Sequence, residues 1–168
     1  KATNEEYSFE SHSNSDIGYL KTIKDGSLNQ NVITIGYNFI SDDIENSNYI
    51  SNNIQWITDG VGRKYMFNYE TNGVISYLDS INVFYNNNDS YEPIIVGNHT
   101  NSEPYNVKYT YQISNNVPYL TSVEHVGENN ISTYTYDNSN RLISISNGIK
   151  TLTLTYDNNL SNKVSSYS

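Results

Sequence analysis

The acidic residues of this sequence are the first candidates for chemistry, because a pair of carboxyl groups can hydrolyse a glycosidic bond. Acids stand close together at Glu5 and Glu6, and again at Asp42, Asp43 and Glu45. Both groups lie in polar stretches, where solvation keeps carboxylates ionised, whereas a catalytic acid needs burial to raise its pKa. We therefore expect solvated charge at these positions and predict no catalytic residue.

Metal binding is disfavoured by the spacing of the candidate ligands. The three histidines, His12, His99 and His125, are far apart and lack metal-ligand spacing. Residues 86–89 and 137–140 offer oxygen ligands for calcium, but both segments lack the loop glycine and the twelfth-position acid of an EF-hand. Their Asn, Asp and Ser residues are those that turns favour, so we interpret both segments as turns. No metal and no cofactor is predicted.

Nucleophilic catalysis has no support in the sequence. The chain contains no cysteine, which excludes disulfides, thiolate metal sites and cysteine catalysis. Serine is abundant, yet no Gly-x-Ser-x-Gly motif singles out one serine as a nucleophile. The sequence therefore predicts a protein that is not an enzyme, and a small hydrolase ranks last of three candidate function classes.

Aromatic side chains are the remaining candidates for a functional surface. The 168 residues include 17 Tyr, four Phe and one Trp. Tyr and Trp exposed on a flat sheet can stack on sugar rings or anchor a protein partner. The same rings can equally line the apolar face that a half-buried strand needs. The candidate ligand-binding residues are Trp56, Tyr37, Tyr69, Tyr111 and Tyr136.

A β-hairpin pattern repeats along the chain. Its clearest copy begins at Ser132 and has Thr and Tyr alternating over residues 133–136, turn-forming residues at 137–140, and a second strand over 141–145. Other copies follow at spacings of about twenty to forty residues, so the loops differ while the strands are kept. Their second strands share a five-residue pattern, the pentad: a long side chain, Leu or Val, any residue, Ser or Thr in most copies, and a large apolar residue. Pentads occupy residues 19–23, 77–81, 119–123, 141–145 and 163–167.

The pentad leaves one geometric question open. Its Leu or Val and its closing apolar residue are three positions apart, which places them on opposite faces of a regular strand. A β-bulge would bring the two side chains onto one face. Alternatively, both faces of the sheet are partly covered, and the sequence does not decide between the two.

The composition and the repeats predict an all-β fold. We expect an up-and-down antiparallel meander of about 10–12 strands, paired mainly with their sequence neighbours. Twist over so many strands favours a strongly curved sheet or a partly closed barrel, with a two-sheet sandwich as the alternative. We expect a single domain over residues 1–168, in which residues 1–6 are a loose terminus and residues 82–104 are an irregular insertion with at most one edge strand.

The charge balance excludes several partners. A formal net charge of −9 repels phosphate backbones and anionic lipid headgroups, so nucleic acid is not an expected partner. No apolar run reaches membrane-spanning length, so no transmembrane segment is predicted.

The chain begins at Lys1 without a starting Met. We expect an export signal that has been removed, with a lipid anchor upstream of Lys1 as one form of attachment.

One stretch resembles a known family. Residues 134–137 (Tyr-Thr-Tyr-Asp), followed by Arg141-Leu142 and Ile145, closely resemble the tyrosine-aspartate repeat of the Rhs and YD-repeat proteins. Residues 132–167 carry this resemblance well, since Leu154-Thr155-Tyr156-Asp157 with Lys163-Val164 is a degenerate second match. Residues 64–125 carry it loosely, because Glu70 and Gln112 stand where the motif has Asp, and residues 1–60 carry it by analogy.

The resemblance has implications for fold, location and function. In its small size and its richness in Asn and Tyr, the chain is more similar to short uncharacterised envelope lipoproteins of Bacteroides-type bacteria. The resemblance implies a β-meander and an exported bacterial protein, located in the cell envelope (periplasm or outer-membrane surface) or outside the cell. It implies no catalytic residue, because the motif is structural. This chain is too short for the toxin-enclosing shell of large Rhs proteins.

Two function classes therefore rank above the hydrolase. The first is a non-catalytic secreted or cell-envelope protein with a structural or interaction role, whose partner is an unknown protein or glycan. The second is a carbohydrate-binding module that uses the Tyr and Trp side chains of the sheet.

Overall fold

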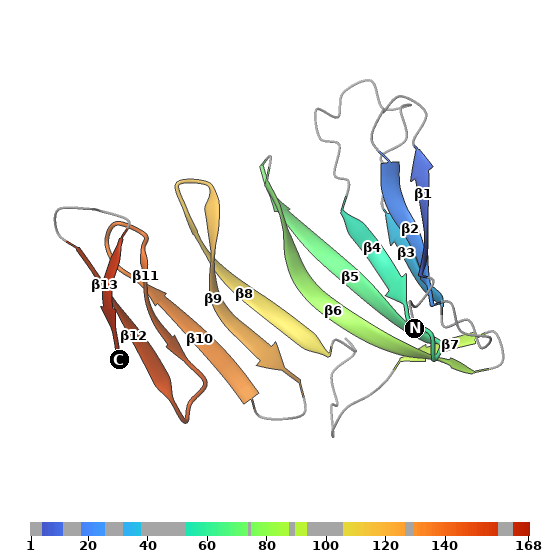
Figure 1. Ribbon diagram of the computed structural model, residues 1–168. Helices are drawn as coiled ribbons and strands as arrows, with labels where there is room; N and C mark the ends of the chain where they lie inside the picture. The colour runs from blue at the N-terminus through green and yellow to red at the C-terminus, as the bar shows by residue number, and fades with distance from the viewer. Residues whose placement is uncertain are drawn as a thin grey trace. The chain divides into compact units, whose positions relative to one another are not determined.

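The fold of the computed structural model consists of β-strands and their connections (Figure 1). The structure describes residues 5–11, 18–25, 32–37, 53–73, 75–87, 90–93, 106–126, 130–157 and 163–168. The strands are β1 (Glu6–Ser11), β2 (Gly18–Lys24), β3 (Val32–Tyr37), β4 (Ile54–Thr58), β5 (Arg63–Asn72), β6 (Ile75–Asn87), β7 (Ser90–Pro93), β8 (Val107–Ser114), β9 (Val117–His125), β10 (Asn130–Tyr136), β11 (Leu142–Ser146), β12 (Thr151–Tyr156) and β13 (Val164–Tyr167). Within these ranges there is no helix with the length and apolarity needed to cross a membrane.

The strand order follows the chain, which confirms the predicted all-β antiparallel meander. The order is β1-β2-β3-β4-β5-β6-β8-β9-β10-β11-β12-β13, and β7 pairs with β6 beside this path. In the described part of the chain β1 pairs with β2 alone and β13 with β12 alone. The order is therefore open and not closed into a barrel, and its strands form one hydrogen-bonded series rather than two separate sheets.

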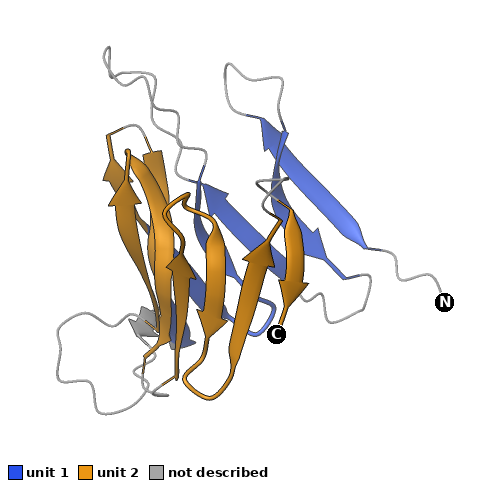
Figure 2. Ribbon diagram, turned by 90° about the vertical axis from the view of Figure 1, so that its left-hand side faces the viewer, with its two compact units in different colours: residues 1–68, 81–94 blue, residues 69–80, 95–168 orange. Residues whose placement is uncertain are grey.

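The chain divides into two compact units (Figure 2). The first unit comprises residues 1–68 and 81–94, and the second comprises residues 69–80 and 95–168. The first therefore contains β1 to β4 and β7, while the second contains β8 to β13. Both units include part of β5 and part of β6, which are the two longest strands at 10 and 13 residues.

The segment from residue 82 onward is more regular than predicted. β6 continues to Asn87 instead of ending before the expected insertion, and β7 folds back on it with Ser90 opposite Asn87. The Asn-rich stretch that suggests a long loop thus contains the end of a strand and a short return. Pro93 ends β7, an edge position where a missing N–H is tolerated. Residues 94–105 lie outside the described ranges, as do residues 1–4 of the expected loose terminus.

A β-bulge stands at the third position of four of the five pentads and at Gln55 of β4. In the β8–β9 hairpin, Thr110 lies opposite Ser122 and Tyr111 lies opposite Leu120, so Thr121 has no partner residue. The residues skipped in the same way are Lys21 in β2, Gln55 in β4, Ile143 in β11 and Ser165 in β13.

The bulge answers the question that the pentad leaves open. Tyr109 and Tyr111 are two residues apart and share one face of β8. Their partners across the hairpin are Val123 and Leu120, which therefore share that face as well. The bulge at Thr121 thus places the second and the fifth pentad residues on the side that carries the tyrosines.

Few side chains are buried in either unit. Among the described residues Ile35, Val126 and Ser80 are buried, and no large side chain is fully enclosed. Along β10, Tyr134 and Tyr136 are half-buried, whereas Thr133 and Thr135 are exposed. In β10 the tyrosine face is thus the more covered face, and with so few buried side chains the described strands depend on cross-strand contacts in place of a deep core.

Candidate functional site

A tyrosine contact, which we call the tyrosine joint, links a hairpin to the one before it. The Tyr136 hydroxyl of β10 donates to the Leu120 carbonyl of β9 at 2.8 Å, and its ring packs against Tyr119 with centroids 5.4 Å apart. The same joint recurs in the first unit, where Tyr37 donates to the Leu20 carbonyl at 3.0 Å. At each site the acceptor is the second residue of a pentad.

One further hairpin repeats the joint with Arg at the first pentad position, and another shows its ring contact. The Tyr156 hydroxyl donates to the Leu142 carbonyl at 2.7 Å, and the Arg141 guanidinium lies 4.6 Å from the centre of the Tyr156 ring. Tyr111 packs on Tyr77, the first residue of the pentad at 77–81, with ring centroids 4.7 Å apart. A tyrosine or an arginine at this position thus supports the incoming ring.

The joint forms where backbone pairing between hairpins ends. Strands β9 and β10 pair as far as Ser122 opposite Thr133, and the next residue of β9 is the bulge residue Thr121. The Leu120 carbonyl lies beyond that ladder and needs a donor from another source. The Tyr136 hydroxyl supplies it, so a side-chain hydrogen bond connects the two strands where their backbone pairing has ended.

Two turns share an Asp-x-x-x-Arg spacing and the same hydrogen bonds. Asp137 Oδ1 accepts from the N–H groups of Ser139 and Arg141 at 2.9 and 3.0 Å, and Asp137 Oδ2 accepts from Arg141 Nε at 2.8 Å. Asp59 accepts from the Val61 and Arg63 N–H groups and from Arg63 Nε at 3.1, 2.9 and 2.6 Å. These bonds make each aspartate the organiser of its turn.

The fourth residue of each of these turns has a left-handed backbone conformation. Its φ is 86° at Gly62 and 59° at Asn140, and glycine and asparagine are the residues that adopt such angles most readily. The sequence predicts a turn at Asp59-Gly60 and Gly62, but not its equivalence to the Asp137 turn, because Thr58 and not Tyr precedes Asp59. The shared spacing of Asp, Gly or Asn, and Arg is the signal that would have found it.

Both aspartates are held in the ionised form. The pKa of Asp137 is lowered by the hydrogen bond from the Arg141 N–H and then by the Arg141 side chain. At Asp59, burial is the largest single effect and acts to raise the pKa. Hydrogen bonds from Arg63, Val61 and Tyr65 together outweigh burial, so the pKa of Asp59 is lowered as well. Neither carboxyl group is suited to act as a general acid at neutral pH.

We expect Asp59→Ala to lower the free energy of unfolding by about 1–2 kcal/mol at pH 7, because turn N–H groups lose their acceptor. Asp59→Asn should cost less, since its amide oxygen can still accept. Because folding lowers the pKa of Asp59, the ionised carboxylate stabilises the fold fully above the ordinary pKa of 3.8. This stabilisation is lost as the pH falls through the lower pKa of Asp59 in the folded protein. Urea denaturation at pH 7 and below pH 3 measures this. An equal difference between the wild type and Asp59→Ala at both pH values would contradict it.

Each unit has a hollow beside a tyrosine joint. The hollow of the second unit has a volume of about 450 Å³ and lies next to Tyr136. The hollow of the first unit has a volume of about 440 Å³ and lies next to Tyr37. Strands β2 and β3 pair as far as Thr22 opposite Thr34, as β9 and β10 do at the corresponding residues. The two hollows are therefore equivalent places in the repeat.

Three of the five candidate binding residues line these hollows. Trp56 and Tyr37 both line the first-unit hollow, and Tyr136 lines the second-unit hollow. Tyr69 and Tyr111 line neither of these two. Tyr69 is 36% exposed on β5, and the Tyr111 ring packs on another tyrosine.

The Trp56 ring is covered from two directions. It lies over Gly36, its partner residue across the β3–β4 hairpin, so closely that a Cβ at Gly36 would fall within 3.0 Å of three ring atoms. The Lys64 ammonium lies 4.9 Å from the ring centre. The glycine thus provides the space that the indole occupies.

Several polar side chains of the second-unit hollow are not anticipated from the sequence. They include Gln112, Thr121, Asn138 and Asn140. Gln112 occupies the position at which the first strand of a hairpin closes with an acid or amide, and Thr121 is the bulge residue. The repeat signals both positions, but only the end of strand pairing shows that they share a hollow.

The remaining acids and histidines do not converge within the described ranges. Glu6 pairs with Lys24 at 3.7 Å, and Glu5 accepts a hydrogen bond from Tyr7. His125 ends β9, while His12, His99 and the acids at 42, 43 and 45 lie outside the described residues. In the part of the chain that the structure describes, no group of three His, Asp or Glu residues could hold a metal ion.

We expect the protein to unfold in alkali as its half-buried tyrosines ionise. Burial is the largest cause that raises the pKa of Tyr109, Tyr111 and Tyr136 above the ordinary tyrosine value of about 10. The stability from these neutral phenols is complete below the unfolded pKa and is lost as the pH rises through the folded values. Tyrosinate absorbance and far-ultraviolet circular dichroism, recorded together above pH 10, should change in step. Complete tyrosine titration with an unchanged strand signal would contradict this expectation.

Comparison with protein-family models finds none that matches the chain, and comparison with curated proteins finds no match either.

Proposed function

We propose that this protein is a non-catalytic secreted or cell-envelope protein with a structural or interaction role, built from YD-like hairpins. One observation carries the proposal: the polar groups best placed for chemistry are engaged in holding the fold. The Asp59 and Asp137 carboxylates accept hydrogen bonds across their own turns, and the Tyr136 hydroxyl donates to a main-chain carbonyl. A repeat engaged in this way suits a scaffold or a binding surface better than a reaction centre.

The resemblance to the Rhs and YD-repeat proteins supports the same proposal. The YD-like stretch of the sequence contains the turn from Asp137 to Arg141, in which both motif residues have a structural role. An equivalent turn runs from Asp59 to Arg63, and it begins at the end of the part of the chain, residues 1–60, that resembles the family by analogy. The resemblance also favours export to the bacterial cell envelope or the medium, with a lipid anchor as one form of attachment.

Fractionation of cells tests the proposed location. A tagged protein expressed from the complete gene in a Bacteroides-type host is expected in the envelope fraction or in the medium. A protein confined to the cytoplasmic fraction would refute export.

A panel of glycoside, ester and peptide substrates tests the absence of catalysis. We expect no turnover above the buffer rate at any pH from 4 to 9. Turnover that disappears when a single acidic residue is replaced by its amide would show that the protein is a hydrolase.

Carbohydrate binding is the second candidate function. It is favoured by the two hollows, each of which combines aromatic rings with polar side chains at an equivalent place in the repeat. Affinity gels with Trp56→Ala test the hollow of the first unit, where loss of retardation would support binding there. The net charge of −9 makes a glycan or a protein a better partner than a nucleic acid.

A further inference from the structure

We propose that the second-unit hollow beside Tyr136 binds a sugar ring of a neutral glycan. This inference rests on the second candidate function and specifies both its site and its ligand class. The volume of about 450 Å³ lies within the range of roughly 300–1,000 Å³ that small-molecule sites occupy. The hollow is therefore large enough for a single sugar ring with its hydroxyl groups.

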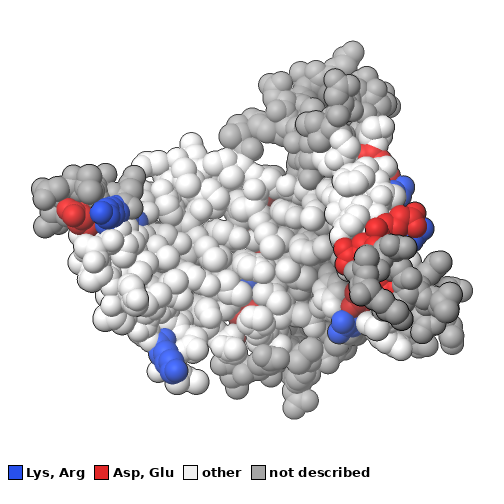
Figure 3. All heavy atoms as spheres, in the orientation of Figure 1, with Lys and Arg blue, Asp and Glu red and all other residues white. Residues whose placement is uncertain are grey.

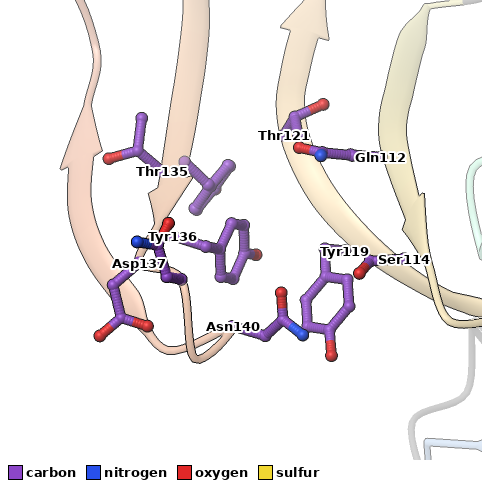
Figure 4. Close-up of a pocket in the computed structure, with 10 residues that line it drawn as sticks. Gln112, Ser114, Tyr119, Thr121, Thr135, Tyr136, Asp137 and Asn140 are labelled. Atoms are coloured by element: carbon purple, nitrogen blue, oxygen red, sulfur yellow. The ribbon is translucent and has the colours of Figure 1, made fainter.

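The lining of the hollow combines an aromatic surface with uncharged hydrogen-bonding groups (Figure 4). The rings of Tyr119 and Tyr136 meet edge to face at 67°, and they form its apolar part. Figure 4 shows the Asn140 amide beside the Tyr119 ring, while Gln112 lies next to Thr121 at the other end of the hollow. A pyranose has a face of C–H groups and a rim of hydroxyls, which matches this division of apolar and polar groups.

The charges around the hollow favour a neutral ligand. Asp137 is the one carboxylate that lines it, and its oxygens already accept hydrogen bonds from Arg141 and Ser139. On the face of the second unit drawn in Figure 3, the strands carry mostly uncharged side chains. The net charge of −9 adds a repulsion against uronates and sulfated sugars.

Contacts within the fold hold part of the lining of the hollow in place, which reduces the entropic cost of binding. The pairing of β9 with β10 ends beside the bulge residue Thr121. Beyond that point the hydrogen bond from Tyr136 to Leu120 connects the two strands. The Asp137 turn sets Asn140 at a φ of 59°. A site whose groups are already in place loses little conformational freedom when a ligand arrives.

The equivalent hollow of the first unit has a different polar pair. Glu10 and Lys21 stand at the positions of Gln112 and Thr121, and they form an ion pair at 2.7 Å. Their polar atoms bond to each other. The Gln112 amide has no such ion pair, and the Thr121 hydroxyl donates to the Thr110 carbonyl at 3.0 Å while its oxygen can still accept a hydrogen bond. The repeat therefore accommodates Glu and Lys at these two positions, which provides a variant that is compatible with the fold.

The experiment compares three variants of the whole chain with the wild type. Gln112→Glu/Thr121→Lys installs the ion pair of the first unit, and Asn140→Gly removes an amide while keeping a residue suited to positive φ, as Gly62 does. The matched control is Asn116→Gly in the β8–β9 turn, where φ is 62° and the residue does not line the hollow. The probes are neutral glucan, mannan and galactan, with polygalacturonate and heparin as the anionic arm, in affinity gels and titration calorimetry.

We expect at least one neutral glycan to bind the wild type and Asn116→Gly equally. Asn140→Gly should weaken that binding about three- to tenfold, the effect of losing one hydrogen-bonding side chain, and the double variant should weaken it at least about tenfold. Thermal melting of every variant verifies that it folds.

The inference would be overturned if no neutral glycan bound the wild type, or if both site variants bound the neutral glycans as tightly as the wild type does. It would also be overturned if the anionic glycans bound the wild type as tightly as the neutral ones. None of these outcomes affects the proposed non-catalytic role, which fractionation and turnover assays test separately.

Discussion

Gly36→Ala should lower the free energy of unfolding by about 1–3 kcal/mol and change the fluorescence of Trp56. The added methyl group would fall within 3.0 Å of three atoms of the Trp56 ring, so the indole must leave the position that it occupies over the glycine. Forcing extra atoms into an occupied space has a cost of this size. Trp56 is the single tryptophan of the chain, so its emission reports this displacement directly. Urea denaturation followed by fluorescence measures both effects.

Gly18→Ala is the matched control for this experiment. It also lies in a strand of the first unit, but its added Cβ would meet Phe9 at an ordinary contact distance of 3.6 Å. We expect its stability to stay within about 0.5 kcal/mol of the wild type. If Gly36→Ala melted like Gly18→Ala with unchanged emission, the packing of Trp56 on Gly36 would be refuted.

Removing three tyrosine hydroxyls together should be the second large effect. The variant Tyr37→Phe/Tyr136→Phe/Tyr156→Phe keeps the rings but leaves the Leu20, Leu120 and Leu142 carbonyls without these donors; the bonds lost are those described for the tyrosine joints. Each lost hydrogen bond costs roughly 0.5–1.5 kcal/mol, and separate sites add. We therefore expect a total loss of about 2–4 kcal/mol in chemical denaturation.

Tyr167→Phe serves as the control for the tyrosine variants. Its side chain is 79% exposed on β13, so the loss of its hydroxyl should change stability by less than about 0.5 kcal/mol. Single variants at Tyr37, Tyr136 and Tyr156 should each contribute a similar share of the total. A triple variant as stable as Tyr167→Phe would mean that water replaces the hydroxyls at no cost.

The order of the strands could be predicted from the sequence because the signals are local. Alternation of Thr and Tyr over residues 133–136 indicates a strand, and the polar run at 137–140 indicates a turn. Neighbouring strands joined by short turns then pair with each other. The same local signals made the Asn-rich stretch near residue 86 look irregular, because β6 continues through it with support from its partner strands.

The bulges and the hollows could not be predicted, because they depend on pairs of strands. Whether Thr121 is skipped is decided by which residues of β8 face β9. The second-unit hollow lies where the pairing of β9 and β10 ends at Ser122. The sequence of neither strand alone shows where that pairing ends. Of the candidate residues, Trp56, Tyr37 and Tyr136 reach a hollow because they stand next to such an ending.

The bulge also limits how repeats of this kind can change in length. Side chains alternate between the two faces of the sheet. One residue gained or lost within a pentad would therefore move the following side chains of that strand to the opposite face. An insertion in a connecting loop leaves the alternation intact and adds little closure entropy. The uneven spacing of the copies, about twenty to forty residues, fits this rule. Duplication and drift could therefore lengthen the connections freely, while each pentad kept its five residues.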